Sequence, residues 1–309
     1  AKKTVRSYLG NGAAHLIKSA MPETVDDETF AKYVADYAEK QNNVDFLHVW
    51  LADSVNKQCE CEECQKKLPS DWYVIMMNEL DKMLEQKGLN TRIVFICYVD
   101  TSWPPIVEKL DNPRRFSLLV APISRDYTTS VDENTVVPEP QPYIRNAWKK
   151  PKGAEENLVF LKSWQEIWDG PCFSYEYHFW RHQFLDPGGL SIARRLHEDV
   201  RSLKYQGLDG YVEDGSQRSF WPNGLAIYVY AEALLNEDVT FEELLEDYFS
   251  HVYGKDWKDA YDYLQKVSNA FDFSFMSGEK SKNAAISLRY DPDRKERFEA
   301  VSELAAECR

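Results

Sequence analysis

The stretch RIVFICYVD, residues 92–100, is a nearly unbroken apolar run that ends in a carboxylate. Such runs are typical of parallel strands, which are buried on both faces. Helix-length segments separate it from four runs of the same kind: Val44–Asp53, Phe116–Asp126, Cys172–His178 and Leu208–Asp214. This alternation predicts an α/β fold, and we expect a (β/α) TIM-type barrel, in which residues just past the strands share one mouth.

Amphipathic segments between these runs predict the helices. Apolar residues at helical spacing favour helices over 24–41, 70–87, 156–168 and 191–205, with a short helical turn at Ile106–Leu110. We expect Thr24 or Asp26 to cap the first of these helices and Ser70 to cap the second. Residues 127–155 are polar and without period, which predicts a long loop of the kind that often covers a site.

A closed barrel needs eight strands, three more than the five runs supply. Ala13–Lys18 is a weak further candidate, and we expect the remaining strands to precede Ala1. From Leu225 onward the pattern is helical. We therefore interpret residues 1–224 as a barrel portion lacking its first strands and residues 225–309 as a helical region packed on it. A smaller open α/β sheet is the structural alternative.

Composition narrows the class of partner. The net charge of −14 argues against nucleic acid, because phosphate binding needs clustered Lys and Arg. No apolar run approaches the roughly 20 residues that cross a bilayer. The chain opens without a signal-peptide pattern and does not begin with Met, which leaves an upstream segment and the compartment open. An aromatic share of 14% suits stacking surfaces, so we expect an oligosaccharide or glycan partner.

Three acidic positions are candidates for catalysis. Asp53 ends the first run, where a barrel presents side chains at its rim, although a turn-capping role is equally open. Glu176 lies among Tyr175, Tyr177, His178 and Trp180, surroundings that favour the protonated carboxyl of a general acid. Strand alternation puts Ser174, Glu176 and His178 on one face and both tyrosines on the other; an ion pair with Arg181 is the structural alternative.

The adjacent acids Glu213 and Asp214 form the third candidate, suited to a base and its orienting partner or to a substitute for either role. Glycosidases use two carboxyl groups across the scissile bond. Polar and aromatic residues that follow the strands are the predicted sugar contacts: Trp50, Tyr98, Asp100, Trp103, Tyr127, His178, Trp180 and Trp221.

The most unusual local feature is CECEEC, which places Cys59, Cys61 and Cys64 within six residues. Three thiols supply most of a zinc site, whose fourth ligand would come from elsewhere, such as His48 or Cys97. A structural metal, a local disulfide and unmodified thiols are all open. We expect no catalytic cysteine here, since no His or Lys neighbours the thiols, and no required cofactor.

His178 and His182, spaced i, i+4 with Asp186 beyond, suggest a second metal hypothesis, a metal-dependent barrel enzyme. Against it, the two histidines follow a predicted strand and precede Asp-Pro-Gly, where helical geometry is doubtful.

Much of residues 40–255 resembles the bacterial domain of unknown function 4838. The resemblance is carried by WLADSVNKQCECEECQKKLPSDWYVIMMNELDKML, IVFICYVDTSWPP, LLVAPISRDY, YEYHFWRHQFLDPGG and FWPNGLAIYVYAEALLNEDVTFEELLEDYFSHVYG. That domain is similar to glycoside hydrolase family 163, whose known members are endo-β-N-acetylglucosaminidases acting on N-glycans. The resemblance implies a longer parent protein with early barrel strands upstream. It matches Asp53 to the family's acid before the cysteines and Glu176 to an acidic position before Tyr-His.

Together these observations predict a glycoside hydrolase with Glu176 as general acid/base and Asp53 as partner carboxylate. The alternatives are a glycan-binding barrel without catalysis and the metal-dependent enzyme.

Overall fold

The computed structural model describes residues 7–8, 27–41, 44–50, 58–147, 149–215, 220, 223–277 and 294–307. Within them, six parallel strands form one sheet in the order β1-β2-β3-β4-β5-β6. The strands are β1 (Ser7–Tyr8), β2 (Phe46–His48), β3 (Arg92–Cys97), β4 (Phe116–Val120), β5 (Cys172–Glu176) and β6 (Tyr211–Glu213).

The helices alternate with the strands and then continue alone. The α-helices are α2 (Asp27–Lys40), α3 (Glu62–Gln65), α4 (Pro69–Gln86), α5 (Ala154–Gln165), α6 (Leu190–Gln206), α7 (Leu225–Leu235), α8 (Phe241–Tyr253), α9 (Trp257–Phe271), α10 (Phe273–Met276) and α11 (Arg294–Glu307). Short 3-10 turns occur at Val99–Thr101, Pro113–Arg115, His182–Leu185 and Gly254–Asp256. None of these helices is long and apolar enough to cross a bilayer.

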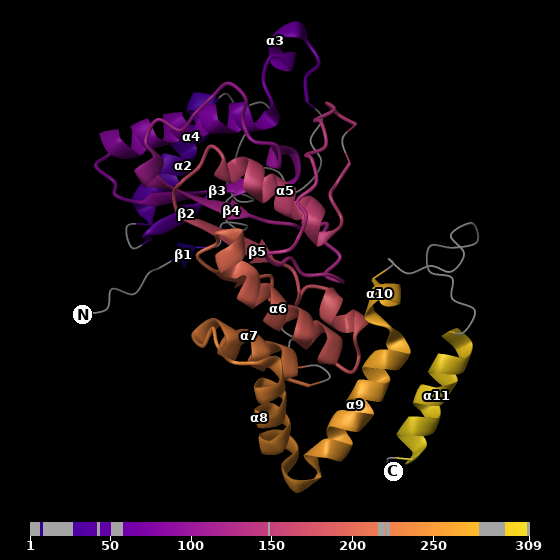
Figure 1. The fold of residues 1–309 in the computed structure, drawn as a ribbon. Helices are drawn as coiled ribbons and strands as arrows, with labels where there is room; N and C mark the ends of the chain where they lie inside the picture. The colour runs from indigo at the N-terminus through magenta and orange to yellow at the C-terminus, as the bar shows by residue number, and fades with distance from the viewer. Residues whose placement is uncertain are drawn as a thin grey trace.

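The sheet is half of a barrel. Strands that follow one another along the chain are also neighbours in the sheet. Crossover connections between parallel strands all have the same handedness. When strands that follow one another along the chain are also neighbours, the connecting helices therefore lie on one face of the sheet, and the sheet curves with these helices on its outer side. In the described residues β1 and β6 are the two ends of this order, which confirms the α/β class and a curled, barrel-like sheet rather than a closed barrel (Figure 1).

Aromatic contacts identify the two faces of the sheet. Phe95 of β3 packs against Trp164 of α5, with ring centroids 5.7 Å apart, so it lies on the helix-covered face. Trp50, which follows β2, contacts Tyr98 and Tyr175 at 5.4 and 5.3 Å. Because side chains alternate along a strand, these three rings lie on the opposite, concave face.

The five predicted strands are confirmed, each shorter than its apolar run. The helical turn predicted at Ile106–Leu110 is wrong: the chain bends at Ile106 and Val107 without forming a helix, and the amides of Val107 and Glu108 both donate to Asp71 of α4 at 2.8 Å. Asp71 also accepts from the Leu68 amide at 2.7 Å, so α4 begins at Pro69 without a cap from Ser70.

Two further expectations, a strand at Ala13–Lys18 and a cap from Thr24 or Asp26, lie outside the described residues.

The C-terminal helices extend away from the sheet and pack on α6 through α7 and α9 (Figure 1). The approach of α9 is close at Gly188, where an added Cβ would lie 2.2 Å from the Leu264 carbonyl oxygen. Thr240 begins α8 with a capping box, in which its side chain accepts from the Glu243 amide. The fold thus joins its helical region to the barrel portion at the helix that follows β5.

Candidate active site

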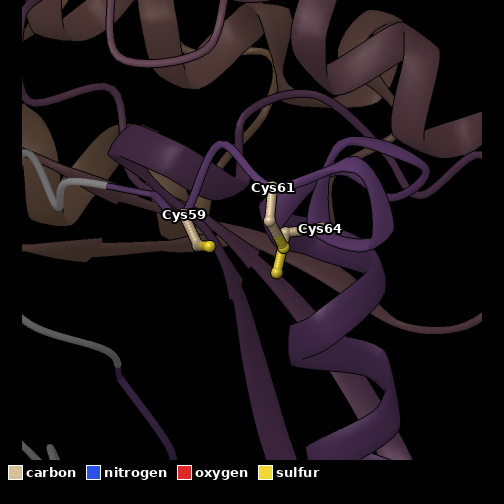
Figure 2. A group of neighbouring side chains, drawn as sticks. All are labelled: Cys59, Cys61 and Cys64. Atoms are coloured by element: carbon tan, nitrogen blue, oxygen red, sulfur yellow. The ribbon is translucent and has the colours of Figure 1, made fainter.

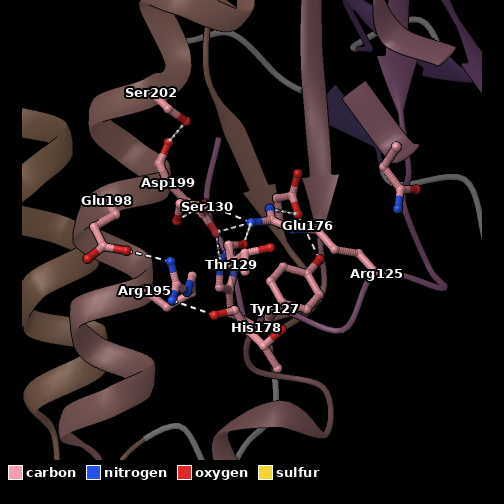
Figure 3. A network of polar contacts seen from close by, with 12 residues as sticks. Arg125, Tyr127, Thr129, Ser130, Glu176, His178, Arg195, Glu198, Asp199 and Ser202 are labelled. Carbon is pink, nitrogen blue, oxygen red and sulfur yellow. Dashed lines mark hydrogen bonds and ion pairs between the residues drawn. The ribbon is translucent and has the colours of Figure 1, made fainter. Parts of the chain in front are cut away.

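A buried polar network lies where β4, β5 and β6 end, against α6 (Figure 3). At its centre is Glu176, whose side chain is 4% exposed. Tyr127 donates its hydroxyl to Glu176 Oε2 at 2.7 Å, and Ser174 donates to Oε1 at 2.5 Å. Arg125 Nη1 lies 3.5 Å from Oε2. Glu176 is therefore paired with Arg125 from the loop after β4, and not with Arg181, the partner in the structural alternative.

Asp199 of α6 is the second anchor of the network. Arg125 Nη2 donates to both of its oxygens, at 2.7 and 2.8 Å, and Ser130 donates to Oδ1 at 2.5 Å. His178 lies between two carboxyl groups, with Nε2 2.8 Å from Asp199 and Nδ1 2.9 Å from Glu213. The side chains of His178 and Asp199 are fully buried, so the opposite charge of each group offsets the free-energy cost of burying the other.

The pKa shifts follow from this enclosure. Burial by itself lowers the pKa of His178, but the charge of Glu213 and the hydrogen bonds to Asp199 and Glu213 raise it to about 9. Burial disfavours the ionised form of Asp199, yet Arg125 and His178 outweigh it and hold the pKa well below its usual range. Burial raises the pKa of Glu213, against the influence of His178. At neutral pH, His178 is thus a cation held between Asp199 and Glu213.

Glu176 lies on the helix-covered face of the sheet. Together with Ser174 it lines a small void of about 20 Å³ that Leu158 of α5 and Gln206 of α6 also border. The predicted alternation is confirmed, since Ser174, Glu176 and His178 share the network while Tyr175 and Tyr177 contact each other at 5.3 Å. The face that carries Glu176 is the one that packs on helices, away from the concave face.

Asp214 occupies the concave face at the end of β6. Its amide donates to the Glu176 carbonyl at 2.7 Å, and its partly exposed carboxyl is hydrogen-bonded to Tyr175. Burial raises the pKa of Asp214, although the Tyr175 hydrogen bond opposes the shift. Burial also raises the pKa of Tyr175, to about 12, which keeps its hydroxyl a donor.

An aromatic run connects Asp214 to the surface. Tyr175 contacts Trp50 and Tyr177, and Tyr177 contacts Trp180 at 5.8 Å. Trp50, Tyr175 and Tyr177 are buried, whereas Trp180 is 44% exposed.

Trp180 borders an open cavity of about 860 Å³ between the loops that follow β4 and β5 and the segment before α5. Charged and polar residues of this wall include Asp126, Lys150, Lys152, Arg181 and His182. Arg181 stacks over the Trp180 ring at 5.2 Å. The wall thus carries three cations, Lys150, Lys152 and Arg181, beside the carboxylate of Asp126. Trp180 offers a ring face to this cavity, and the three cations favour a ligand that carries an anionic group.

The structure separates the predicted site residues. Tyr127 and His178 are fully buried in the polar network, while Trp103 packs on Phe160 at 4.8 Å and donates to the Gln141 carbonyl. Asp100 is buried and accepts from Gln58 at 3.3 Å.

Asp53 and Trp221 lie outside the described residues. Glu176, Glu213 and His178 are brought together, and Asp214 lies on the other face. Among the described aromatic residues predicted to contact sugar, Trp180 is the exposed one.

Within the described part of the chain, His178, His182 and Asp186 do not form a group that could hold a metal ion. Both ring nitrogens of His178 are engaged by carboxyl groups, and His182 Nδ1 lies 3.4 Å from the Tyr177 carbonyl. Asp186 accepts from Ser268 and from amides at the start of α6. These three side chains serve separate structural contacts.

The three thiols of CECEEC do come together: the sulfur atoms of Cys59, Cys61 and Cys64 all lie within 4.8 Å of one another (Figure 2). Hydrogen bonds from the Cys64 backbone and from the other two thiols lower the pKa of Cys61 to about 7. The hydrogen bond with Cys61 raises the pKa of Cys64 to about 11. The suggested fourth ligands are not part of the group, because His48 packs on Phe173 and Cys97 is buried in β3.

Sequence reasoning missed Arg125 and Asp199. A signal for Asp199 was present: it falls between Leu196 and Val200 on the buried stripe of α6, where a carboxylate requires a partner. No comparable pattern marks Arg125, because its loop is neither periodic nor enriched in charge.

The sequence matches no protein-family model, and no curated protein or solved structure is significantly similar to it.

Proposed function

We propose that this protein is a carbohydrate-active enzyme, a glycoside hydrolase, and that Asp214 is its proton-donating carboxyl group. The position of Asp214 carries the proposal: it follows a parallel strand at the edge where barrel enzymes present catalytic residues. Its carboxyl is partly exposed, and burial raises its pKa. A carboxyl that keeps its proton to higher pH suits general-acid catalysis of glycoside cleavage.

Glu176 then acts as a positioning residue. Its carboxyl is enclosed by Tyr127, Ser174 and Arg125, which leaves no route for direct proton transfer to a sugar in this arrangement. Its carbonyl oxygen, however, accepts the Asp214 amide. Fixing the end of β5 therefore fixes the backbone from which Asp214 projects. Asp53 keeps its proposed role as the second carboxylate, on the strength of its sequence position.

The cavity beside Trp180 is the proposed sugar-binding region. Trp180 offers a ring face, and Lys150, Lys152 and Arg181 favour a glycan that carries carboxylate or sulfate groups. The resemblance to glycoside hydrolase family 163 favours N-glycans instead. A panel of N-glycans, neutral plant polysaccharides and uronate-containing oligosaccharides, with products identified by mass spectrometry, distinguishes these substrate classes.

Paired variants test the assignment of the acid. Asp214→Asn should abolish product release and leave glycan binding and thermal unfolding unchanged, because it replaces the titratable carboxyl group by a non-titrating amide of nearly the same volume. Asp238→Asn, at an exposed turn before α8, is the matched control and should retain full activity. Wild-type turnover by Asp214→Asn would remove Asp214 from the mechanism. If Glu176→Gln alone abolished cleavage, the acid would be Glu176.

A glycan-binding barrel without catalysis is the second candidate. It is favoured by the enclosure of Glu176 and by Trp180, the exposed ring among the described predicted sugar contacts. Binding of a panel member measured by calorimetry, without any released product, would support this function. Trp180→Ala should then weaken binding, whereas Asp214→Asn should not.

A further inference from the structure

We propose that Cys59, Cys61 and Cys64 bind one zinc ion through three thiolates, and that this ion fastens their loop to the turn carrying Arg145 and Asn146. The three sulfur atoms already lie within 4.8 Å of one another. In a tetrahedral site with Zn–S bonds of about 2.3 Å, sulfur atoms lie about 3.8 Å apart. Contraction by about 1 Å or less therefore brings all three into coordination, well within what exposed side chains allow.

Local backbone geometry holds the thiols on one side of the loop (Figure 2). Cys61 precedes α3, Cys64 lies within it, and the Gln65 amide donates to the Cys61 carbonyl at 3.0 Å. This single helical turn keeps the C-x-x-C pair at the spacing of short zinc motifs. Cys59 then completes the group from the extended chain before the turn.

Residues Arg145 and Asn146 hold the thiol loop from more than 80 positions away. Arg145 donates to the carbonyls of Cys59 and Cys64, at 3.3 and 2.8 Å. Asn146 accepts from the Gln58 amide at 2.7 Å and donates to the Gln58 carbonyl at 2.9 Å. These contacts fix the backbone of two ligands before any ion arrives, which reduces the entropy lost on binding.

The charges of the site suit a divalent, thiophilic ion. When three thiols coordinate, their protons pass to solvent as three Zn–S bonds form, without any redox change, and the site carries one net negative charge. The Arg145 guanidinium, bound to the ligand backbone, offsets that charge. The group has three members among the residues that the structure describes, and a tetrahedral ion takes one further ligand.

The bound ion would also restrain residues near the end of β3. Gln58, next to the first thiol, donates its side-chain amide to buried Asp100 at 3.3 Å. Zinc at the thiols thus stabilises a connection between the thiol loop, the Arg145 turn and Asp100, which lies in the 3-10 turn after β3. This inference is independent of the proposed glycosidase activity.

The test uses the full chain, purified under reducing conditions, with zinc and cobalt as probes. We expect one zinc per chain by elemental mass spectrometry and the visible bands of thiolate-bound cobalt on titration with Co²⁺. Each of Cys59→Ser, Cys61→Ser and Cys64→Ser should weaken zinc binding at least about tenfold. Cys172→Ser, which removes the buried thiol of β5 and leaves the three cluster thiols in place, should bind as the wild type does.

Hydrogen exchange tests the fastening. Zinc should slow exchange in residues 58–67 and 141–147 together, and Arg145→Ala should abolish the effect on the second segment. Three outcomes would overturn the proposal: no stoichiometric zinc in the reduced wild type, equal binding after loss of all three thiols, or a disulfide among them that persists under the reducing conditions. Protection confined to residues 58–67 would refute the fastening.

Discussion

Raising the pH should destabilise the protein through His178. The folded state holds the pKa of this imidazole at about 9, against an ordinary value of 6.5, so its contribution is complete below pH 6.5 and is lost as the pH rises through 9. At about 1.4 kcal/mol per pH unit, the difference corresponds to about 3 kcal/mol of the free energy of unfolding. Because the ring is fully buried, solvent should screen little of this effect.

The assay is urea unfolding followed by tryptophan fluorescence across pH 6.5 to 9, for the wild type and His178→Gln. The variant lacks the titrating ring, so its stability deficit should shrink by about 3 kcal/mol over this window. Subtraction also cancels Cys61, whose lowered pKa of about 7 acts with the opposite sign. His48 and His182, both with a pKa lowered to about 4, add only a small slope close to pH 6.5, where their unfolded rings are still half protonated, and subtraction cancels that slope as well.

His251→Gln, on the exposed face of α8, is the matched control and should leave the pH dependence unchanged. A deficit for His178→Gln that stays constant from pH 6.5 to 9 would refute the interpretation of His178 as a buried cation. Direct titration of the ring by NMR provides a second measurement that does not depend on how well the variant folds.

Three further changes probe the network, the helical region and the proposed acid. Arg125→Met should lower the free energy of unfolding by about 3–5 kcal/mol, because buried Glu176 loses its cation and buried Asp199 keeps only His178; a urea midpoint equal to that of the wild type would contradict this. Gly188→Ala should destabilise by about 1–3 kcal/mol, since its Cβ has no room beside α9, whereas Gly210→Ala meets no atom within 4 Å and should be nearly neutral in thermal unfolding. Tyr175→Phe removes a hydrogen bond that lowers the pKa of Asp214, so the basic limb of the pH–rate profile should move to higher pH; an unmoved limb would separate Asp214 from the rate.

The sheet was predictable because burial of a parallel strand leaves a local trace. Residues 93–97 are apolar throughout, residues 116–120 are apolar except for Ser117, and both segments lie in strands. Element ends were less predictable, since they depend on distant partners. The segment after Trp103 bends without forming a helix because Asp71 of α4 accepts from two of its amides, and nothing within the segment itself indicates this.

The candidate site divides in the same way. The sequence determined that acids follow β5 and β6, that Ser174 and Glu176 share a face, and that three thiols crowd one loop, because each of these is set by spacing along the chain. Only the tertiary structure decided that Glu176 faces the helices while Asp214 faces the concave side. That choice depends on Arg125 and Asp199, which lie 74 residues apart and meet only once α6 has packed on the sheet.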